Sequence, residues 1–347
     1  MLEAAFAVPG DLSASTGGYA YARKLLALAP EVDVTLHHGP LPAGFPHPSP
    51  ADLTETAARL RDARGAVLLV DGLAYGAFTS DLVETLDRPI VALVHHPLAF
   101  ETGLDPARRD ALAVSERGAL ARARAVVASS RETARILAAD YGVPSSRITV
   151  AEPGTDPAPR SSGTGNPVQL VAVGTVSPRK AFDILVAALA GLADLPWRLT
   201  IAGAVDRDPT AAAALVTAID AAGLRERVSL VGVLGESELS DLYAAADVLV
   251  SPSLYEGYGM ALAEALARGL PVVASTGGAA AQTVPDAAGL KVPPGDVGAL
   301  RDALARMIAD PALRRRCADA AWAAGQSLPR WRDTASTIAA VLREAAR

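Results

Sequence analysis

The chain has little of several residue types, and each shortage narrows the class of protein. It has one cysteine, Cys317, in 347 residues, so no internal disulfide can form, and no Cys/His cluster suggests a zinc site. Aromatic residues make up only 4% of the chain, so Ala, Val and Leu must build its cores. No uninterrupted apolar run approaches the ~18 residues of a membrane-spanning helix, and the N-terminus lacks the basic start of a signal peptide. We therefore expect a cytoplasmic protein.

Positive charge is also scarce. The 32 lysines and arginines are outnumbered by 38 acidic residues, which gives a formal net charge of -6. Global attraction to nucleic acid or anionic lipid is therefore not expected, so we predict no nucleic-acid partner and, at most, peripheral membrane association. Asp110 and Glu116 interrupt the arginine-rich segment 108–124, which we interpret as a solvated helix rather than a membrane-surface face.

Apolar runs alternate with segments of helical spacing along most of the chain. Such alternation predicts an α/β fold with two Rossmann-like halves, each containing a parallel sheet covered by helices on both faces. The Pro-, Gly- and Ser-rich segment 157–167 is the best candidate linker. We place one domain at 1–160 and the other at 167–328, and we expect ligands beyond the carboxyl ends of the strands.

The segment 247–275 is the most informative part of the sequence. Its pattern predicts strand, loop, helix and strand, and the loop carries Glu256 beside Gly257 and Gly259. Glycines let a ligand approach the backbone closely, and the first amides of the following helix attract anions. A second carboxylate, Glu264, lies eight residues after the first. The pattern favours a ligand with a phosphate close to these glycines.

The spacing of the two carboxylates indicates an elongated ligand. At a rise of about 1.5 Å per residue they lie at most ~12 Å apart along the helix axis. Each carboxylate can accept two hydroxyl hydrogen bonds, so the hexose and ribose of a nucleotide sugar would suit them, with the diphosphate between. The alternative is that Glu256 is a turn residue and Glu264 a solvated helix residue.

The stretch Tyr-Glu-Gly-Tyr-Gly-Met-Ala-Leu-Ala-Glu-Ala, residues 255–265, resembles the donor-site signature of the family-4 retaining glycosyltransferases of GT-B fold. The resemblance implies two Rossmann-like domains facing each other across a cleft, an acceptor domain first and a donor domain second. It also implies that the final helix, 331–347, packs back on the first domain. Glu256 would orient the sugar and Glu264 would hold the ribose. The other donor-contacting positions implied in this stretch are Gly257, Tyr258, Gly259, Met260, Ala261 and Leu262.

Two cations follow the first strand of the second half. That strand ends at Gly174, and Arg179 with Lys180, one of only three lysines, comes soon after. Cations at the mouth of the sheet can neutralise a leaving diphosphate, whereas cations that merely decorate a helix start would oppose its dipole. Members of the family have Gly-Arg-Leu and a Lys-Gly pair here. This chain has Thr175 and Ala181 instead, which leaves the two cations as the expected diphosphate ligands.

Two loops of the second half give weaker signals. The backbone near Val233 could contact the base, by analogy with the family. Asp206 and Asp208 match the Asp-x-Asp pattern by which another glycosyltransferase fold holds a metal. Because aspartates before a proline at a helix start are more often capping residues, we interpret them as caps and predict no metal.

The first half contributes a glycine pair and a histidine pair. Gly17 and Gly18 form a permissive loop that could close over the diphosphate, as a similar loop does in the family. Two adjacent histidines follow the strand expected at 90–94. By its spacing to the Pro-Leu-Ala that follows, the second, His96, resembles the active-site histidine of the family. Glu101 and the loop 102–106 are expected near the acceptor.

The residues and the resemblance together imply a retaining, metal-independent hexosyltransferase with His96, Arg179, Lys180 and Glu256 as catalytic residues. The donor would be a nucleotide sugar, UDP favoured over GDP, and the acceptor a hydroxyl on a small molecule, glycan or lipid-linked compound, with no other cofactor. Two alternatives stay open: a sugar-nucleotide epimerase or phosphorylase, and a non-catalytic nucleotide-sugar-binding subunit, since Thr175 departs from the family pattern. A nicotinamide dehydrogenase is disfavoured because no Gly-x-Gly-x-x-Gly follows the first strand of either half.

Overall fold

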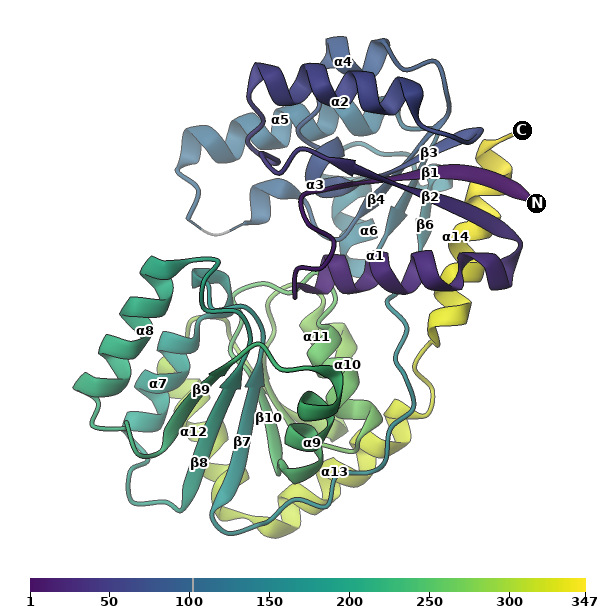
Figure 1. Ribbon diagram of the computed structural model, residues 1–347. Helices are drawn as coiled ribbons and strands as arrows, with labels where there is room; N and C mark the ends of the chain where they lie inside the picture. The colour runs from purple at the N-terminus through teal and green to yellow at the C-terminus, as the bar shows by residue number, and fades with distance from the viewer. Residues whose placement is uncertain (102) are drawn as a thin grey trace. The chain divides into compact units, whose positions relative to one another are not determined.

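The computed structural model describes residues 1–101 and 103–347, and the chain divides into two compact units (Figure 1). The first unit consists of Met1–Gly154 and Pro329–Arg347, and the second of Thr155–Leu328. Each unit contains a six-stranded parallel sheet, so the predicted α/β class with two Rossmann-like sheets is confirmed. The linker expected at 157–167 lies inside the second unit.

The first unit has the strand order β2-β1-β3-β4-β5-β6. Its strands are β1 (Leu2–Pro9), β2 (Val34–Leu41), β3 (Val67–Asp71), β4 (Ile90–Val94), β5 (Ala125–Ala128) and β6 (Ile148–Val150). Its α-helices are α1 (Gly17–Leu28), α2 (Pro50–Asp62), α3 (Gly72–Tyr75), α4 (Ser80–Glu84), α5 (Pro106–Arg122), α6 (Arg131–Ala139) and α14 (Trp331–Ala345). Short 3-10 turns are η1 (Ala29–Val32), η2 (Leu98–Phe100) and η3 (Ser145–Arg147).

The central strands of this unit are apolar throughout, as expected when helices cover both faces of a parallel sheet. All residues of β3 and β4 are buried. The apolar run at 32–36 predicts a strand, whereas β2 begins at Val34 and extends to Leu41. The 3-10 turn η1 ends at Val32, and its C-cap Asp33, with a positive φ of 55°, redirects the chain before the strand begins.

Helix α14 belongs to the first unit although it is distant in sequence (Figure 1). It contacts α1 and β4, and its buried face includes Trp331 and Ile338. The Trp331 ring lies edge-on to Tyr21, 5.5 Å between centroids. The hydroxyl of Thr334 donates a 2.7 Å hydrogen bond to the carbonyl of Glu152. These contacts fix the end of β6 beside the helix that returns.

The prediction of a solvated helix at 108–124 is only partly confirmed by α5. Residues 105–110 are exposed, as expected for a solvated helix. Glu116, however, is only 1% exposed, so its interpretation as part of a solvated face is wrong. The helix turns this side chain into the unit, where it contacts η2 and not solvent.

The second unit has the strand order β12-β11-β10-β7-β8-β9. Its strands are β7 (Val168–Val173), β8 (Trp197–Ala202), β9 (Val228–Gly232), β10 (Val248–Ser251), β11 (Val272–Ser275) and β12 (Gly289–Val292). Its helices are α7 (Phe182–Ala190), α8 (Pro209–Ala221), α9 (Glu236–Ala245), α10 (Met260–Ala267), α11 (Ala280–Thr283), α12 (Val297–Ala309) and α13 (Pro311–Gly325). Its 3-10 turns are η4 (Pro178–Lys180) and η5 (Asp286–Ala288).

Small aliphatic side chains make most of the core of the second unit, as the scarcity of aromatics predicts. The main exception is Trp197 on β8, which is 1% exposed. Its indole N–H donates to the carbonyl of Leu192 at 2.7 Å, and the guanidinium of Arg227 lies 3.9 Å from the ring centroid. Within the described ranges 1–101 and 103–347, no helix combines the length and apolar character needed to span a bilayer.

Candidate functional site

The loop after β10 is fixed by backbone hydrogen bonds to the loop after β11. The amide of Glu256 donates to the carbonyl of Gly277 at 3.1 Å, and the amide of Ala279 donates to the carbonyl of Glu256 at 2.8 Å. A Cβ atom at Gly277 would lie 2.1 Å from the carbonyl oxygen of Leu254, so only glycine fits there. The carboxyl ends of two neighbouring strands are thereby tied into one edge.

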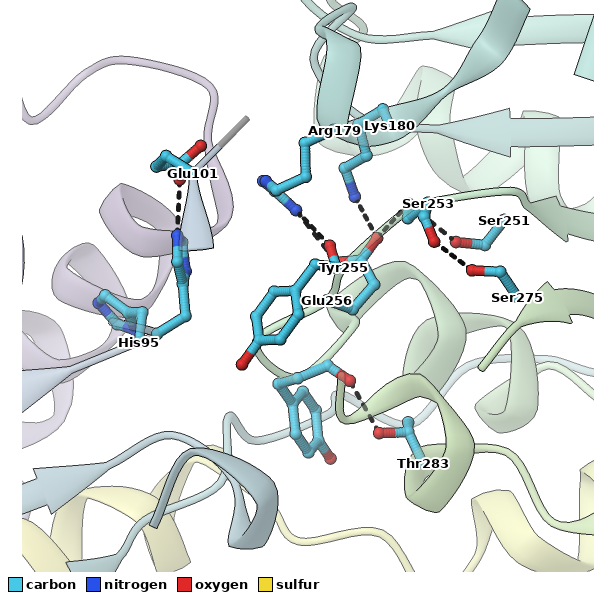
Figure 2. A network of polar contacts seen from close by, with 12 residues as sticks. His95, Glu101, Arg179, Lys180, Ser251, Ser253, Tyr255, Glu256, Ser275 and Thr283 are labelled. Carbon is cyan, nitrogen blue, oxygen red and sulfur yellow. Dashed lines mark hydrogen bonds and ion pairs between the residues drawn. The ribbon is translucent and has the colours of Figure 1, made fainter. Parts of the chain in front are cut away.

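The carboxylate of Glu256 is the centre of a buried polar cluster (Figure 2). Its Oε1 accepts from Lys180 Nζ and from Ser253 Oγ, each at 2.6 Å, and its Oε2 lies 3.8 Å from Arg179. Glu256 is 6% exposed. Burial raises the pKa of this carboxyl, but the positive charges of Lys180 and Arg179 outweigh burial, so the net pKa is below its ordinary value. The side chain is therefore ionised at neutral pH.

The two cations reach the cluster from η4, after β7. The Lys180 side chain passes over Gly174, where a Cβ atom would lie 2.7 Å from Lys180 Cε. Arg179 donates to the carbonyl of Tyr255 at 2.8 Å and so reaches the same loop as the lysine. The next residue, Ala181, has φ 51°, a conformation that glycine adopts without the Cβ penalty. A glycine at this position, as in the Lys-Gly pair of the family that the sequence resembles, would adopt this φ without strain.

Helix α10 begins directly after this loop without a side-chain cap. Gly259 is its N-cap at φ 90°, a left-handed conformation that favours glycine, and it is buried. Its carbonyl accepts from the amides of Leu262 and Ala263, while the amides of Met260 and Ala261 precede the first intrahelical bond. Such an end attracts anions through aligned amides and the helix dipole.

The second carboxylate, Glu264, lies further along α10 and is half-buried. Its Oε2 accepts a 2.8 Å hydrogen bond from the hydroxyl of Tyr243 on α9, which is fully buried. The guanidinium of Arg268 lies 4.7 Å from the Tyr243 ring centroid. Burial, followed by the neighbouring Glu264, raises the pKa of Tyr243 well above its ordinary value, so it stays a hydrogen-bond donor. The Glu264 side chain is thus fixed from α9, a contact that the sequence did not predict.

Two other predicted positions of the second unit lie at strand ends. Val233 follows β9, the outer strand of the sheet, and is 52% exposed. Asp208 caps α8, accepting from the amide of Ala211 at 2.9 Å, as its interpretation as a cap predicts. Residues 1–101 and 103–347 contain no group of three or more His, Cys, Asp and Glu side chains placed to hold a metal ion.

In the first unit the two adjacent histidines have different side-chain partners. His96 Nε2 lies 2.6 Å from a carboxylate oxygen of Glu101. His95 Nε2 lies 3.5 Å from Asp71 Oδ2, and a Cβ atom at Gly18 would lie 3.4 Å from the His95 ring. Gly18 therefore lies beside the His95 ring.

Gly17 is the first residue of α1, where Thr16 caps the helix. Asp71, at the end of β3, was missed because nothing in its local sequence marks it as a histidine partner. Within the loop expected at 102–106, Thr102 lies outside the described residues. The roles predicted for the donor and acceptor residues stay predictions.

Comparison with protein families gives two matches that together cover most of the chain. Residues 157–323 match the family of glycosyl transferases group 1, and residues 19–159 match glycosyltransferase family 4. The boundary between the two matches lies close to the boundary between the two units.

Several curated relatives share one enzyme name. A D-inositol 3-phosphate glycosyltransferase of Xylanimonas cellulosilytica is 34% identical over 250 residues, 67% of this chain and 60% of that protein. One of Kribbella flavida is 31% identical over 288 residues, 75% of this chain and 67% of that protein. The chain thus spans about three fifths of the length of the first relatives it matches.

Solved structures share the fold. Sucrose-phosphate synthase of Thermosynechococcus elongatus superposes with a TM-score of 0.85 at 22% identity, over 99% of each chain. HepE of Anabaena, in complex with UDP and glucose, gives a TM-score of 0.76 at 17% identity, over 99% of this chain and 100% of that one. These likenesses confirm the GT-B type of fold.

Proposed function

This chain belongs to the glycosyltransferases of group 1 and family 4, and from that premise we propose that it transfers a hexose-type sugar from a nucleotide diphosphate sugar to a hydroxyl acceptor. The observation that carries the proposal is the cluster of Lys180, Arg179 and ionised Glu256 beside the uncapped start of α10. Cations and helix amides suit a diphosphate, and an adjacent buried carboxylate suits sugar hydroxyls.

The charges of the cluster fit a leaving diphosphate. Lys180 and Arg179 carry two positive charges, and Glu256 offsets one of them. The surplus positive charge, with the amide dipoles of α10, would stabilise negative charge that grows on the diphosphate as the bond to the sugar breaks. Since these groups are already held by Ser253 and the backbone, they need little reorganisation when the donor binds.

We propose a retaining transfer without a covalent sugar–enzyme intermediate. The acceptor hydroxyl would attack the anomeric carbon on the side from which the diphosphate leaves. The bond from that carbon to the diphosphate oxygen breaks, a bond to the acceptor oxygen forms, and the hydroxyl proton passes to the departing diphosphate. In this mechanism Glu256 orients the sugar through its hydroxyls, and the two cations replace the metal ion that other glycosyltransferases use.

Donor and acceptor classes follow from the same reasoning. Glu264, fixed by Tyr243, would accept from the ribose hydroxyls, and exposed Val233 would lie under the base. A UDP-sugar is the first donor to test. Because the curated relatives are named for D-inositol 3-phosphate, a phosphorylated cyclic polyol is the first acceptor to test.

A labelled-donor assay tests the proposal. UDP- and GDP-sugars are first screened for thermal stabilisation. The best donor, radiolabelled in the sugar, is then incubated with and without acceptors, and the anomeric configuration of the product is read by NMR. A product that keeps the donor configuration and forms only with acceptor supports the proposal, whereas sugar conversion without acceptor indicates an epimerase. Donor binding with neither transfer nor slow donor hydrolysis would indicate a binding subunit.

A variant pair links activity to the cluster. Lys180→Ala removes the cation on Glu256, so we expect kcat/KM to fall by about 100-fold or more. Arg225→Ala is the matched control, because Arg225 forms an exposed ion pair with Asp220 on the same unit, before β9 begins. Equal activity of both variants would contradict the assignment of the cluster.

A further inference from the structure

Glu116 is a buried acid with no place in the proposed mechanism. It extends from α5 towards η2, where its Oε2 accepts a 2.9 Å hydrogen bond from the amide of Leu98. The hydroxyl of Tyr141, after α6, forms a hydrogen bond with the same carboxyl. Gly76, which ends α3, makes room for it: a Cβ atom there would lie 3.1 Å from Glu116 Cγ and 2.8 Å from Leu98 Cδ1. Groups from η2, from the end of α3 and from the chain after α6 therefore surround one carboxyl group on α5.

The segment that this carboxyl holds carries both histidines. At one end, the carbonyl of His95 accepts from Ser129 Oγ at 2.9 Å and from Thr133 Oγ1 at 3.2 Å. At the other end, His96 bonds Glu101. Between these points Glu116 holds the backbone at Leu98. Movement at that amide would therefore shift the histidine pair.

The surroundings of Glu116 contain no cation that pairs with it in the part of the chain that the structure describes. From α3 and η2 it meets Gly76 and the backbone of Leu98, which are uncharged. From the side of α6 it meets the Tyr141 hydroxyl. Arg117 and Asp140 lie beside that tyrosine: the Arg117 guanidinium lies 5.6 Å from the ring centroid, and Asp140 is its chain neighbour.

Burial therefore decides the proton state of this acid. Burial raises the pKa of Glu116 to about 8, although the hydrogen bonds from Leu98 and Tyr141 oppose the rise. The carboxyl is neutral at pH 7 and ionises in mildly alkaline solution. An ionised carboxylate here has two hydrogen bonds but no counter-charge, which favours entry of water between α5 and η2.

We propose that Glu116 is a positioning residue of the transferase: its neutral carboxyl holds Leu98, and through it the His95–Glu101 segment, in the active position, and ionisation releases the segment. The effect of Glu116 on transfer activity rests on the proposed function, whereas its hold on Leu98 does not.

The hold on Leu98 is tested by NMR on the whole chain. The amide signal of Leu98 is followed from pH 6 to 9.5 in the wild type, in Glu116→Gln and in Glu84→Gln. We expect it to titrate with a midpoint near pH 8 in the wild type. It should also titrate in Glu84→Gln, which loses an exposed carboxylate that pairs with Arg122 on α5. It should not titrate in Glu116→Gln, whose amide oxygen can accept from Leu98 but cannot ionise. A Leu98 signal independent of pH in the wild type would overturn the proposal.

The effect on transfer activity is tested by the pH profile of kcat. From pH 7 to 9.5 we expect kcat of the wild type and of Glu84→Gln to fall by about tenfold or more. Glu116→Gln should change less than about twofold over the same interval while keeping at least half of the wild-type kcat at pH 6.5. Glu116→Ala, which cannot accept from Leu98, should be impaired at every pH. Identical profiles in the wild type and Glu116→Gln would overturn the positioning role.

Different outcomes would refute the proposed function and the positioning role of Glu116. A wild-type chain whose Leu98 amide titrates, but which transfers no sugar to any acceptor, would refute the proposed function and support the hold on the segment. A chain that transfers sugar with parallel profiles in the wild type and Glu116→Gln would support the proposed function and refute the role of Glu116.

Discussion

Stability should respond to Glu116 in the direction opposite to that of an ordinary carboxylate. Its pKa is about 8 in the folded chain and near the ordinary 4.5 when unfolded. Between these values the folded state binds one more proton than the unfolded state, so stability is full below about pH 4.5 and falls as the pH rises towards 8. A carboxylate whose folded pKa is lowered, such as Glu256, contributes the opposite slope.

The magnitude follows from the proton linkage. One proton contributes about 1.4 kcal/mol for each pH unit, so between pH 6 and 8 this group should cost the first unit about 2–3 kcal/mol. Glu116→Gln keeps an acceptor for Leu98 but cannot ionise. All other titrating groups are common to both chains and cancel in the difference. The variant should therefore gain about 2–3 kcal/mol relative to the wild type between these two pH values.

The assay must report the two units separately. Urea unfolding followed by pulsed hydrogen exchange, read on peptides of β4 and α5, measures the free energy of unfolding of the first unit. Glu84→Gln is the control and should keep the same difference from the wild type at both pH values. A difference between Glu116→Gln and the wild type that changes by less than about 0.5 kcal/mol from pH 6 to 8 would refute the reasoning.

Further predictions concern the second unit. Transfer activity should persist in EDTA, and a complete loss that Mg²⁺ reverses would contradict the metal-free proposal. Lys180→Met should destabilise this unit by about 2–4 kcal/mol at pH 7, because it leaves Glu256 buried with only the more distant Arg179; a Lys180→Arg control in urea unfolding should lose less. Glu264→Gln should raise the donor KM by about tenfold with a smaller effect on kcat, and the reverse pattern in steady-state kinetics would argue against a ribose contact. Gly277→Ala should lower the Tm of this unit by several degrees, since the new Cβ would meet a carbonyl oxygen at 2.1 Å; unchanged calorimetry would show that the loop can relax.

Local sequence patterns were sufficient to predict the two parallel sheets and the strand ends that bring Lys180 and Glu256 together. Buried parallel strands are apolar along their whole length, so runs such as 67–70 and 90–94 stand out between helices. The Glu-x7-Glu stretch and the Arg179–Lys180 pair each follow a strand, and parallel strands end at one edge of a sheet. The contact between Lys180 and Glu256 agrees with that expectation.

Side-chain partners could not be predicted in the same way, because tertiary packing sets them. Tyr243 is 21 residues before Glu264, and no periodicity relates two helices that meet only through packing. Glu116 lies on an arginine-rich helix whose start is exposed, so composition favoured a solvated position, but the pocket beside Gly76 buries it. The two histidines differ by one position, and only the fold shows which one contacts Gly18.

The return of α14 to the first unit has a consequence for how the chain is made. The first unit is complete only after residues 329–347 have been added, and the whole second unit, Thr155–Leu328, is translated in between. At 5–20 residues per second a ribosome needs roughly 10–35 s for that insertion. During this interval the surfaces of α1 and β4 that later cover Trp331 and Ile338 stay without their partner. Until α14 is added, the nascent first unit therefore exposes an apolar surface that the folded unit buries.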